Sequence, residues 1–521
     1  MNVRCRSLAP SVVIGPLVSF TILLSCSLLS AQQPLPTGAS IVPAPADPAI
    51  VSALQQVSPD NIHAIIEKLV SFNNRSTLSS MDTDLPPGTG VSAAADWVES
   101  EFKRYSQACG GCLEVKRDDF IEPPGTGPNA RITKPTKITN VYAILRGTDP
   151  AQAARRVLVT GHYDSRNTLN ANTHDPAPGA NDDASGVAVS LESARVLSKL
   201  KFPSTIVFVA VAGEEQGLNG SAHLAKLAKS EGWELEAVLN NDIVGGDTTP
   251  GNNTPPNIQD KSAVRVFSEG VPAGTTPEQL RAIQTLGAED DSPSRELARS
   301  IADISPSYFR VTSQHGSAGT LPGRAHNNLM RMIPAFHPVL IFRRDRFLRG
   351  GDHTSFNTEG FAAVRFTEWS ENFDHQHQDV RVENGIQYGD LLQFVDVNYV
   401  ANVTRLNAAT LATLASAPGT PQDVHILTAD LDNNTELTWE APSGAPAGTA
   451  YEVVWRPSDQ PNWTMSASAG SALSLKLAVS KDNVVFGVRS VDAAGHRSPA
   501  VLPTPLRPTR GNPATKPATP Q

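Results

Sequence analysis

VLVTGHYDS at residues 157–165 opens the stretch that decides the fold, and PGANDDASG (178–186), VAGEEQGLNGS (211–221) and LNNDIVGG (239–246) complete it. Three of these pieces begin in apolar runs, and all four hold carboxylates, with a histidine in the first. Apolar runs bounded by glycine are typical of buried strands in a parallel sheet. Ligands of open α/β sheets bind outside the carboxyl ends of the strands. The sequence therefore predicts that these polar groups meet at one edge of a sheet.

Five side chains in this stretch have the chemistry of a metal site: His162, Asp182, Glu214, Glu215 and Asp242. Imidazole and carboxylate together suit zinc, and a catalytic zinc keeps one position open for water. Two metal ions about 3.5–4 Å apart need a ligand that touches both. Asp182 is our candidate for this ligand, because Gly179 and Gly186 let the backbone turn tightly before a helix that begins near Ala184.

Two further carboxylates have expected roles beside the metal. Asp164 lies two residues after His162 on an extended segment, so both side chains point the same way and Asp164 can hold the imidazole. Glu214 and Glu215 cannot both face the same way on a strand. In a loop, one of them can bind metal while the other serves as the base that a metal-activated water needs.

These segments resemble the di-zinc aminopeptidase family of bacterial leucyl aminopeptidases, which also includes glutamate carboxypeptidase and is similar to the glutaminyl cyclases. In that family the His of HxD, the Asp of GxND, the second Glu of GEE and the Asp of an NxD strand end are ligands. The resemblance covers about residues 55–415. It implies two zinc ions held by His162, Asp182, Glu215 and Asp242, with Asp182 bridging and Glu214 as the general base.

The segment EWSENFDHQHQDV (368–380) is where the family shows a histidine followed shortly by an acid, and that histidine completes the second zinc site. This sequence departs from the pattern by offering two histidines. His377 fits the spacing from residues 371–373 better, whereas His375 has the usual three residues before Asp379. We predict His377 as the ligand and keep His375 as the alternative, the other residue contacting substrate or a ligand.

The segment IFRRDRFLRGGDHTSF (341–356) combines four arginines with Asp352 and His353. In the resembling family a similar segment lies close to the metals without usually supplying a ligand. Asp352 and His353 are therefore candidates for contact with substrate or with the ligands. The arginines could bind a substrate carboxylate, although such a run is more often a solvated surface.

Alternating periodicity predicts an α/β fold with a doubly wound mixed sheet. The expected helices span 58–72, 92–105, 184–200, 220–229, 276–286, 293–303 and 391–415, and the expected strands 141–145, 157–159, 205–211 and 361–366. Together they form a peptidase domain at 55–416, which follows a flexible linker at 32–54.

The character of the chain changes after the hinge APGTP (417–421). Short alternating runs separated by turns predict a small all-β sandwich at 420–505, which resembles a fibronectin type III domain. Trp439 and the alternating Val484, Phe486 and Val488 are expected in its core. We interpret it as a binding or spacer module for surface or polymer contact, followed by a disordered tail at 506–521.

Composition and the first residues indicate where the protein works. Acidic residues (52) nearly balance basic ones (43) in a chain of 521 residues with net charge −9, which argues against a nucleic-acid partner. Residues 1–31 have the basic start, apolar run and small residues of a cleaved signal peptide, and cleavage is expected near Ala31. Lipoprotein anchoring at Cys26 is the weaker alternative. We expect a secreted or periplasmic protein with no membrane span in the mature chain, and a disulfide between Cys109 and Cys112.

The activity expected from these features is zinc-dependent removal of N-terminal residues from peptides. A carboxypeptidase or glutaminyl cyclase would use similar ligands on the same fold. An exported binding protein with a purely structural metal is the alternative outside the enzymes, but a structural site has no use for the Glu214–Glu215 pair.

Overall fold

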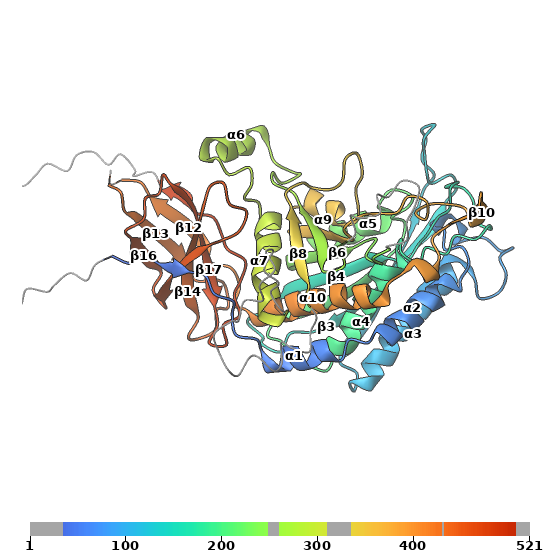
Figure 1. Cartoon of the computed structure of the whole chain (residues 1–521), viewed down its shortest axis with the longest axis horizontal. Coiled ribbons are helices and arrows are strands. Elements are labelled where there is room, and N and C mark those ends of the chain that lie inside the picture. The colour runs from blue at the N-terminus through green and yellow to red at the C-terminus, as the bar shows by residue number, and fades with distance from the viewer. Residues whose placement is uncertain (1–34, 248–259, 310–334, 430–431, 507–521) are drawn as a thin grey trace, which may run out of the picture. The chain divides into compact units, whose positions relative to one another are not determined.

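A mixed sheet of eight strands forms the centre of the larger domain in the computed structural model, which describes residues 35–247, 260–309, 335–429 and 432–506 (Figure 1). The strands lie in the order β2-β3-β5-β4-β6-β9-β7-β8. They span Leu113–Glu122 (β2), Thr136–Leu145 (β3), Arg155–His162 (β4), Thr205–Val211 (β5), Glu234–Asn241 (β6), Ala263–Ser268 (β7), His337–Ile341 (β8) and Ala363–Thr367 (β9). Strands β5, β4, β6 and β9 run parallel at its centre, so their carboxyl ends meet at one edge.

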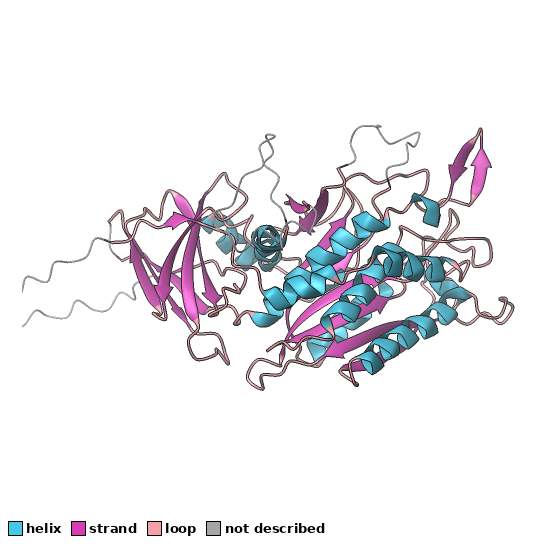
Figure 2. Cartoon of the chain, turned by 60° about the horizontal axis from the view of Figure 1, so that its bottom comes forward, coloured by secondary structure: helices cyan, strands magenta, loops and turns pink. Residues whose placement is uncertain are grey.

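Helices cover both faces of this sheet, as the doubly wound prediction required (Figure 2). One apolar core receives Ile206 and Phe208 of β5, and the other receives Val207 and Val209, because successive residues of a strand face opposite sides. The first core is completed by α1 (Pro48–Gln55), α2 (Pro59–Val70), α3 (Gly90–Ala108), α4 (Ala184–Leu197), α7 (Pro293–Tyr308) and α10 (Val397–Ser416), and the second by α5 (Asn219–Ser230) and α9 (His353–Thr358). Burial on both faces explains the unbroken apolar runs in the sequence.

Several helices begin where short-range signals place them. Ser58 accepts the N–H of Asn61 at 3.2 Å and starts α2, whose first residue is a proline. The helix expected at 391–415 begins six residues later, because Asp396 caps it and the preceding residues form a 3₁₀ turn, η2 (Leu392–Phe394). Helix α6 (Pro277–Leu286) has no buried residue, although a capping box starts it.

The stretch at 32–54 is not a flexible linker in its described part. Residues Ala39–Ser40 form the short strand β1, which pairs with Met465 and Ser466 of the C-terminal sandwich. Asp47 then accepts backbone N–H groups and caps α1 ahead of Pro48, and the apolar side chains of α1 enter the core. The proline and alanine residues of this stretch were interpreted as a linker, although proline also suits the first turn of a helix.

Two four-stranded sheets form the C-terminal sandwich. Their order is β1-β15-β14-β17 and β16-β13-β12-β18, and the strands span Gln422–Leu427 (β12), Thr435–Glu440 (β13), Ala450–Pro457 (β14), Met465–Gly470 (β15), Ser474–Leu477 (β16), Val484–Val491 (β17) and Thr504–Leu506 (β18). Trp439, Phe486 and Val488 lie in its core, as expected, and Val484 packs against it.

Buried ion pairs join helix α7 to this sandwich. Asp291, just before α7, pairs with Arg299 of the helix at 2.9 Å and also with Arg456 of β14. Trp463 donates its indole N–H to Glu296 of α7 at 3.0 Å. These side chains of α7 are almost fully buried, so the sandwich is packed against the helix through polar contacts.

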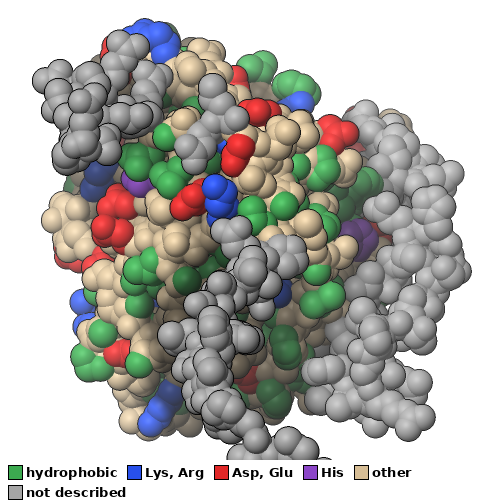
Figure 3. Space-filling model, turned by 90° about the vertical axis from the view of Figure 1, so that its left-hand side faces the viewer, with side chains coloured by type: hydrophobic (Ala, Val, Ile, Leu, Met, Phe, Trp, Pro, Cys, Tyr) green, Lys and Arg blue, Asp and Glu red, His purple; other side chains and the backbone are tan. Residues whose placement is uncertain are grey.

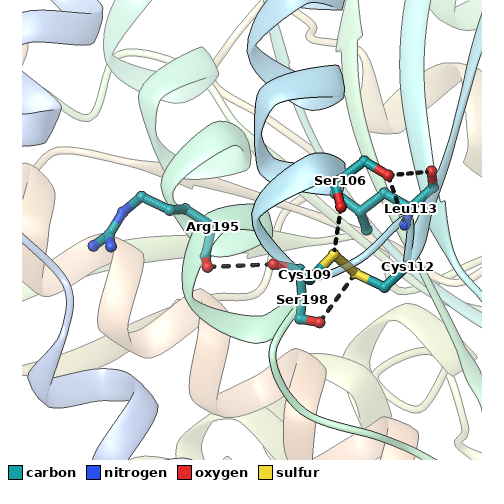
Figure 4. The surroundings of a disulfide bond; sticks show 6 residues. All are labelled: Ser106, Cys109, Cys112, Leu113, Arg195 and Ser198. Carbon is teal, nitrogen blue, oxygen red and sulfur yellow. Dashed lines mark hydrogen bonds between the residues drawn. A yellow bond between two sulfur atoms is a disulfide. The ribbon is translucent and has the colours of Figure 1, made fainter.

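The expected disulfide between Cys109 and Cys112 connects the end of α3 to the start of β2 (Figure 4). The Cys112 sulfur also lies 3.1 Å from the carbonyl oxygen of Ser198, just after α4. Basic, acidic and apolar side chains are interspersed on the face drawn in Figure 3, which fits the near balance of charges. Within the described residues, no helix has the length and apolar character needed to cross a bilayer.

The predicted signal peptide and most of the C-terminal tail lie outside the described residues. Several strands were not predicted from the sequence: β2, β7, β8 and the hairpin of β10 (Arg381–Glu383) and β11 (Ile386–Tyr388). Strands β2, β8, β10 and β11 are partly exposed, and Arg265 interrupts the short apolar run of β7, so none of them has a long unbroken apolar run.

Candidate metal centre

Adjacent parallel strands deliver the predicted ligands to one edge of the sheet. His162 is the last residue of β4, Glu214 and Glu215 follow β5, and Asp242 follows β6. Asp182 lies in the loop between β4 and α4, two residues before the helix starts. Strands β4 and β5 are neighbours in the sheet, and the chain leaves β4 toward α4 on one face and leaves β5 toward α5 on the other. The two connections therefore diverge and open a crevice at this edge.

Asp182 lies between the two histidines. Its Oδ1 is 3.1 Å from Nε2 of His162, and its Oδ2 is 2.9 Å from Nε2 of His377. Asp242 is 4.0 Å from His162, and Glu215 is 3.0 Å from His377. Two groups of potential ligands result, one around His162 and one around His377, with an oxygen of Asp182 facing each.

The geometry and chemistry of these groups fit zinc. Two ligand atoms about 2.0–2.2 Å from one tetrahedral ion lie about 3.3–3.6 Å apart, close to the separations of 2.9–4.0 Å seen here. Nε2 of His162 and Oε1 of Glu215 are buried, and neither makes a hydrogen bond of good geometry, although Asp182 and His377 lie close to them. Buried polar atoms without a partner are costly, and a cation between these groups would satisfy both.

The charges at the site favour a cation. Burial lowers the pKa of His377, but the carboxylates of Glu215 and Asp182 outweigh burial and raise it to about 10. Burial likewise opposes charge on His162, while the carboxylates of Asp164 and Asp182 beside it raise its pKa well above the ordinary value. The same negative field that holds a proton on each imidazole would hold a metal ion in its place.

Asp164 contacts His162 as expected. Nδ1 of the imidazole lies 3.4 Å from Oδ1 of Asp164 and 3.1 Å from its carbonyl oxygen. The other carboxylate oxygen accepts the hydroxyl of Thr77 at 3.0 Å and the N–H of Glu215 at 3.3 Å. Asp164 is fully buried, so it orients His162 and Glu215 and does not reach the cavity.

Glu214 lines a cavity of about 630 Å³ above the two groups, together with Asp182, Glu215, Asp242 and His377. Burial, followed by the nearby carboxylates of Asp242 and Glu215, raises the pKa of Glu214 well above the value of a free glutamate. A carboxylate that holds a proton readily and faces the cavity has the properties of a general base.

His375 takes no part in either group. Its Nδ1 pairs with Asp247, and its ring stacks on Phe394 with centroids 3.7 Å apart. His377, two residues later, has a positive φ of 54° that turns its side chain to Asp182 and Glu215. The structure therefore places His377, and not His375, where the second group needs a ligand.

Asp352 and His353 lie behind the site and do not line the cavity. Both are fully buried. Burial raises the pKa of Asp352 to about 7. His353 Nε2 lies 2.8 Å from the carbonyl oxygen of Arg344. Both residues are therefore placed to support the site and not to contact a substrate in the cavity.

Three residues that the sequence analysis did not single out hold Asp182 and its loop. Asp183 is fully buried and accepts the N–H of His162 at 3.0 Å. Gln376 donates to Oδ2 of Asp182 at 3.0 Å, and Asp390 accepts the N–H of Asp182 at 2.7 Å. The last contact joins residues 208 positions apart, so no local pattern could have indicated it.

Two fully buried arginines also support the site. Arg75 donates to the carbonyl oxygens of Tyr163 and Gly179 and so fixes the loops that carry the ligands. Arg365 of β9 forms an ion pair with Asp242 at 2.8 Å. The sequence offers one signal for Arg365, its position within the apolar strand VRF. An arginine buried there needs a charged partner.

The chain matches known proteins over most of its length. Residues 140–310 match the model of peptidase family M28. A probable zinc metalloprotease of Leptosphaeria maculans is 42% identical over 463 residues, which cover 89% of this chain and 98% of that protein. A probable zinc metalloprotease of Pyricularia oryzae is also 42% identical, over 88% of this chain and 85% of that one.

Solved structures with a similar arrangement are more distant. The Legionella pneumophila LapA aminopeptidase is 20% identical, with a TM-score of 0.44 over 73% of this chain and 78% of that one. A glutaminyl cyclase of Porphyromonas gingivalis is 16% identical, with a TM-score of 0.41 over 68% of this chain and 97% of that one. With the family model matched across His162, Asp182, Glu215 and Asp242, and relatives at 42% identity along nearly the whole chain, the protein belongs to peptidase family M28.

Proposed function

We propose that the protein is an exported zinc-dependent aminopeptidase that removes N-terminal residues from peptides at a centre of two zinc ions. One observation carries the proposal. The two carboxylate oxygens of Asp182 face two different histidines, at 3.1 and 2.9 Å, inside a cavity that also exposes Glu214. A structural site needs neither a bridging carboxylate nor a base, which argues against a purely binding role.

The proposed ligands divide into two sets that share Asp182. His162 and Asp242 would hold one ion, and Glu215 and His377 the other. Two zinc ions bound there would polarise the scissile carbonyl, lower the pKa of the attacking water and help to anchor the free α-amine. This assignment agrees with the names of the relatives, which are probable zinc metalloproteases.

The residues of the chain carry the proton in this proposal. Glu214 accepts a proton from the attacking water and returns it to the nitrogen of the leaving amine, which the raised pKa of its carboxyl favours. Asp164 keeps the imidazole of His162 oriented, and Arg365 keeps the carboxylate of Asp242 in place. Preorganised groups of this kind reduce the rearrangement needed during the reaction.

Export and the role of the C-terminal sandwich belong to the same proposal. The signal-like N-terminus supports secretion or transfer to a periplasm, and the Cys109–Cys112 disulfide suits an oxidising compartment. The sandwich, in our proposal a fibronectin type III-like module, contains no group of metal-ligating side chains in its described residues. It would act in contact or support and not in the reaction.

The deciding experiment measures hydrolysis of leucine p-nitroanilide by the zinc-loaded protein, with N-acetyl-leucine p-nitroanilide beside it. We expect cleavage of the free amine alone, together with two zinc ions per chain by elemental analysis. Cleavage of neither compound by a protein that holds two zinc ions would contradict the aminopeptidase proposal. Peptides with a free C-terminus and N-terminal glutamine peptides would then test the carboxypeptidase and cyclase alternatives.

A further inference from the structure

We propose that the active-site cavity selects peptides that carry a carboxylate close to the scissile bond, bound by the arginines of the cavity wall. The inference rests on the proposed peptidase function and names its substrate class. Four arginines line the cavity that contains Glu214: Arg131, Arg166, Arg346 and Arg349. The chain as a whole is acidic, with net charge −9, so this grouping of cations is a local feature.

Arg346 and Arg349 share a single carboxylate with a third arginine. Each donates Nη1 to the same oxygen of Glu371 at 2.6 Å, and Arg265 pairs with the other oxygen at 3.2 Å. The carboxylate of Glu371 is therefore shared by three guanidinium groups. Arg349 keeps nearly a third of its side chain exposed, and Phe373 packs against its guanidinium at 5.7 Å. The cluster holds Arg349 in position without neutralising it.

The cluster is anchored to the metal centre by a chain of ion pairs. Arg346 also pairs with Asp345 at 3.0 Å, and Asp345 pairs with the buried Arg365 at 3.3 Å. Arg365 in turn holds Asp242, a proposed zinc ligand, at 2.8 Å. The arginines of the wall are thus fixed relative to the reacting centre, and fixed donors bind an anion with little loss of side-chain entropy.

Two further arginines of the cavity, Arg131 and Arg166, have no acidic partner within the described part of the chain. Arg166 is half-buried and donates only to the carbonyl oxygen of its neighbour Asn167, at 3.2 Å. Arg131 donates to the carbonyl oxygen of Glu215 at 3.0 Å. Neither forms an ion pair with a carboxylate of the described residues. Both side chains line the cavity.

The balance of charge in the cavity makes an anion the natural ligand. Four carboxylates line its floor: Asp182, Glu214, Glu215 and Asp242. Two divalent zinc ions would offset these four charges. Arg346 and Arg349 would still share the carboxylate of Glu371, and Arg131 and Arg166 form no ion pair within the described residues, so the lining would carry a surplus of positive charge. Arginine binds carboxylate through paired charge-assisted hydrogen bonds, and a concave site of one sign concentrates ligands of the other.

Two sources of carboxylate fit this chemistry: the C-terminus of a very short peptide, or the side chain of aspartate or glutamate. Kinetics on matched peptides separate them. Leucyl-alaninamide has no carboxylate, leucyl-alanine has a terminal one, and leucyl-aspartamide and glutamyl-alaninamide each carry one on a side chain. Leucyl-asparaginamide and glutaminyl-alaninamide are their neutral isosteres.

We expect kcat/KM of at least one carboxylate peptide to exceed that of its neutral counterpart by about tenfold or more, mainly through KM. Arg166→Gln and Arg349→Gln should each reduce this preference and leave leucyl-alaninamide within about twofold of its original rate. Arg281→Gln is the matched control, because Arg281 pairs with Glu278 on the exposed helix α6. If leucyl-alanine is the preferred peptide, the terminal carboxylate is the ligand. If leucyl-aspartamide or glutamyl-alaninamide is preferred over its neutral isostere, the side-chain carboxylate is the ligand.

Equal rates for charged and neutral peptides in the unaltered enzyme would overturn the inference while leaving the aminopeptidase intact. Equal loss on all peptides in the arginine variants would also overturn it, since the arginines would then serve the fold or the reaction in general. If leucyl-alaninamide and every other peptide stay uncleaved with two zinc ions bound, the proposed function itself fails and the inference fails with it.

Discussion

Glu214 is the residue on which the proposed chemistry depends. Changing Glu214 to glutamine keeps its shape and removes its ability to accept a proton, so kcat should fall by about 10²–10⁴-fold. The zinc content should stay at two ions per chain, because Glu214 is not among the proposed ligands. Elemental analysis and hydrolysis of leucine p-nitroanilide measure both. Glu278→Gln on exposed α6 is the control, and an unchanged rate in the Glu214 variant would remove it from the mechanism.

The two histidines of the DHQHQ segment provide a matched pair of variants. His377→Ala should lose one zinc ion per chain and most activity, because its Nε2 faces Asp182 and Glu215. His375→Ala should keep both ions but melt earlier, because its stacking on Phe394 and its bond to Asp247 are lost. Metal content and thermal melting separate the two effects. Loss of zinc from the His375 variant alone would contradict the assignment.

The predicted ligands could be found from sequence because each follows a strand or precedes a helix that is itself visible as an apolar run. His162, Glu215 and Asp242 are of this kind. Asp390 and Arg75 could not be found, because they reach Asp182 and its loop from elements far along the chain. Choosing between His375 and His377 also needed the structure, since a single positive φ decides which ring turns toward Asp182.

At the scale of elements, α4 packs directly on the strands that carry the site. A Cβ on Gly186, in the first turn of α4, would collide with the carbonyl oxygen of Asn241 and with Asp183. A Cβ on Gly161 of β4 would collide with the backbone of Gly186. Both glycines have an ordinary φ and permit a close approach of two backbone segments. Gly186 therefore does not form the tight turn expected from the sequence, whereas Gly179 has the positive φ of such a turn.

Gly186→Ala should therefore lower the melting temperature and weaken zinc binding together, because the helix start and Asp182 must move apart from β6. Overpacking of this kind costs about 1–3 kcal/mol of unfolding free energy. Gly127→Ala, where nothing lies within 4 Å of the added carbon, is the control. Denaturant unfolding and zinc titration provide the readouts. A Gly186 variant with the stability of the Gly127 variant would show that the helix can shift without cost.

Burial decides which strands could be predicted from the sequence. Strand β5 was predicted at its observed bounds, because both of its faces lie in apolar cores. Strand β8 lies at the edge of the sheet and is only partly buried throughout, so no apolar pattern identified it. Helix α1 was missed for a different reason: its proline and alanine residues resemble those of a linker.

Across the whole molecule, buried charges connect the peptidase fold to the sandwich. Asp291 forms ion pairs with both Arg299 and Arg456, and all three side chains are at most 3% exposed. Asp291→Asn should cost about 3–5 kcal/mol of unfolding free energy, because it removes the charge of the carboxylate that the two buried guanidinium groups share. Asp290→Asn, one residue away with a side chain 68% exposed, should cost little. Equal melting temperatures for the two variants would show that these contacts do not hold the sandwich in place.

A histidine ties the N-terminal segment to the sandwich. Burial lowers the pKa of His496, but Asp492, at 2.7 Å, and Asp47 outweigh burial and raise it above its ordinary value. Such a group stabilises the fold fully below the unfolded pKa of about 6.5 and loses this contribution as the pH rises through its folded pKa. The stability lost in His496→Gln should therefore be largest near pH 6 and shrink at alkaline pH. His63→Gln, exposed on α2, is the control, and a loss that does not vary with pH would contradict the pairing.

Strand β1 also has a consequence for how the protein is made. Residues Ala39–Ser40 complete a sheet whose other strands lie between residues 450 and 491, so that sheet has its full set of strands only after more than 400 further residues have been synthesised. Ser40 and Met465 are 425 positions apart, and the N-terminal segment has no β15 to pair with until then. Proteolysis that removed the chain up to Ser40 would uncover the edge of β15, and an exposed edge strand can pair with other chains.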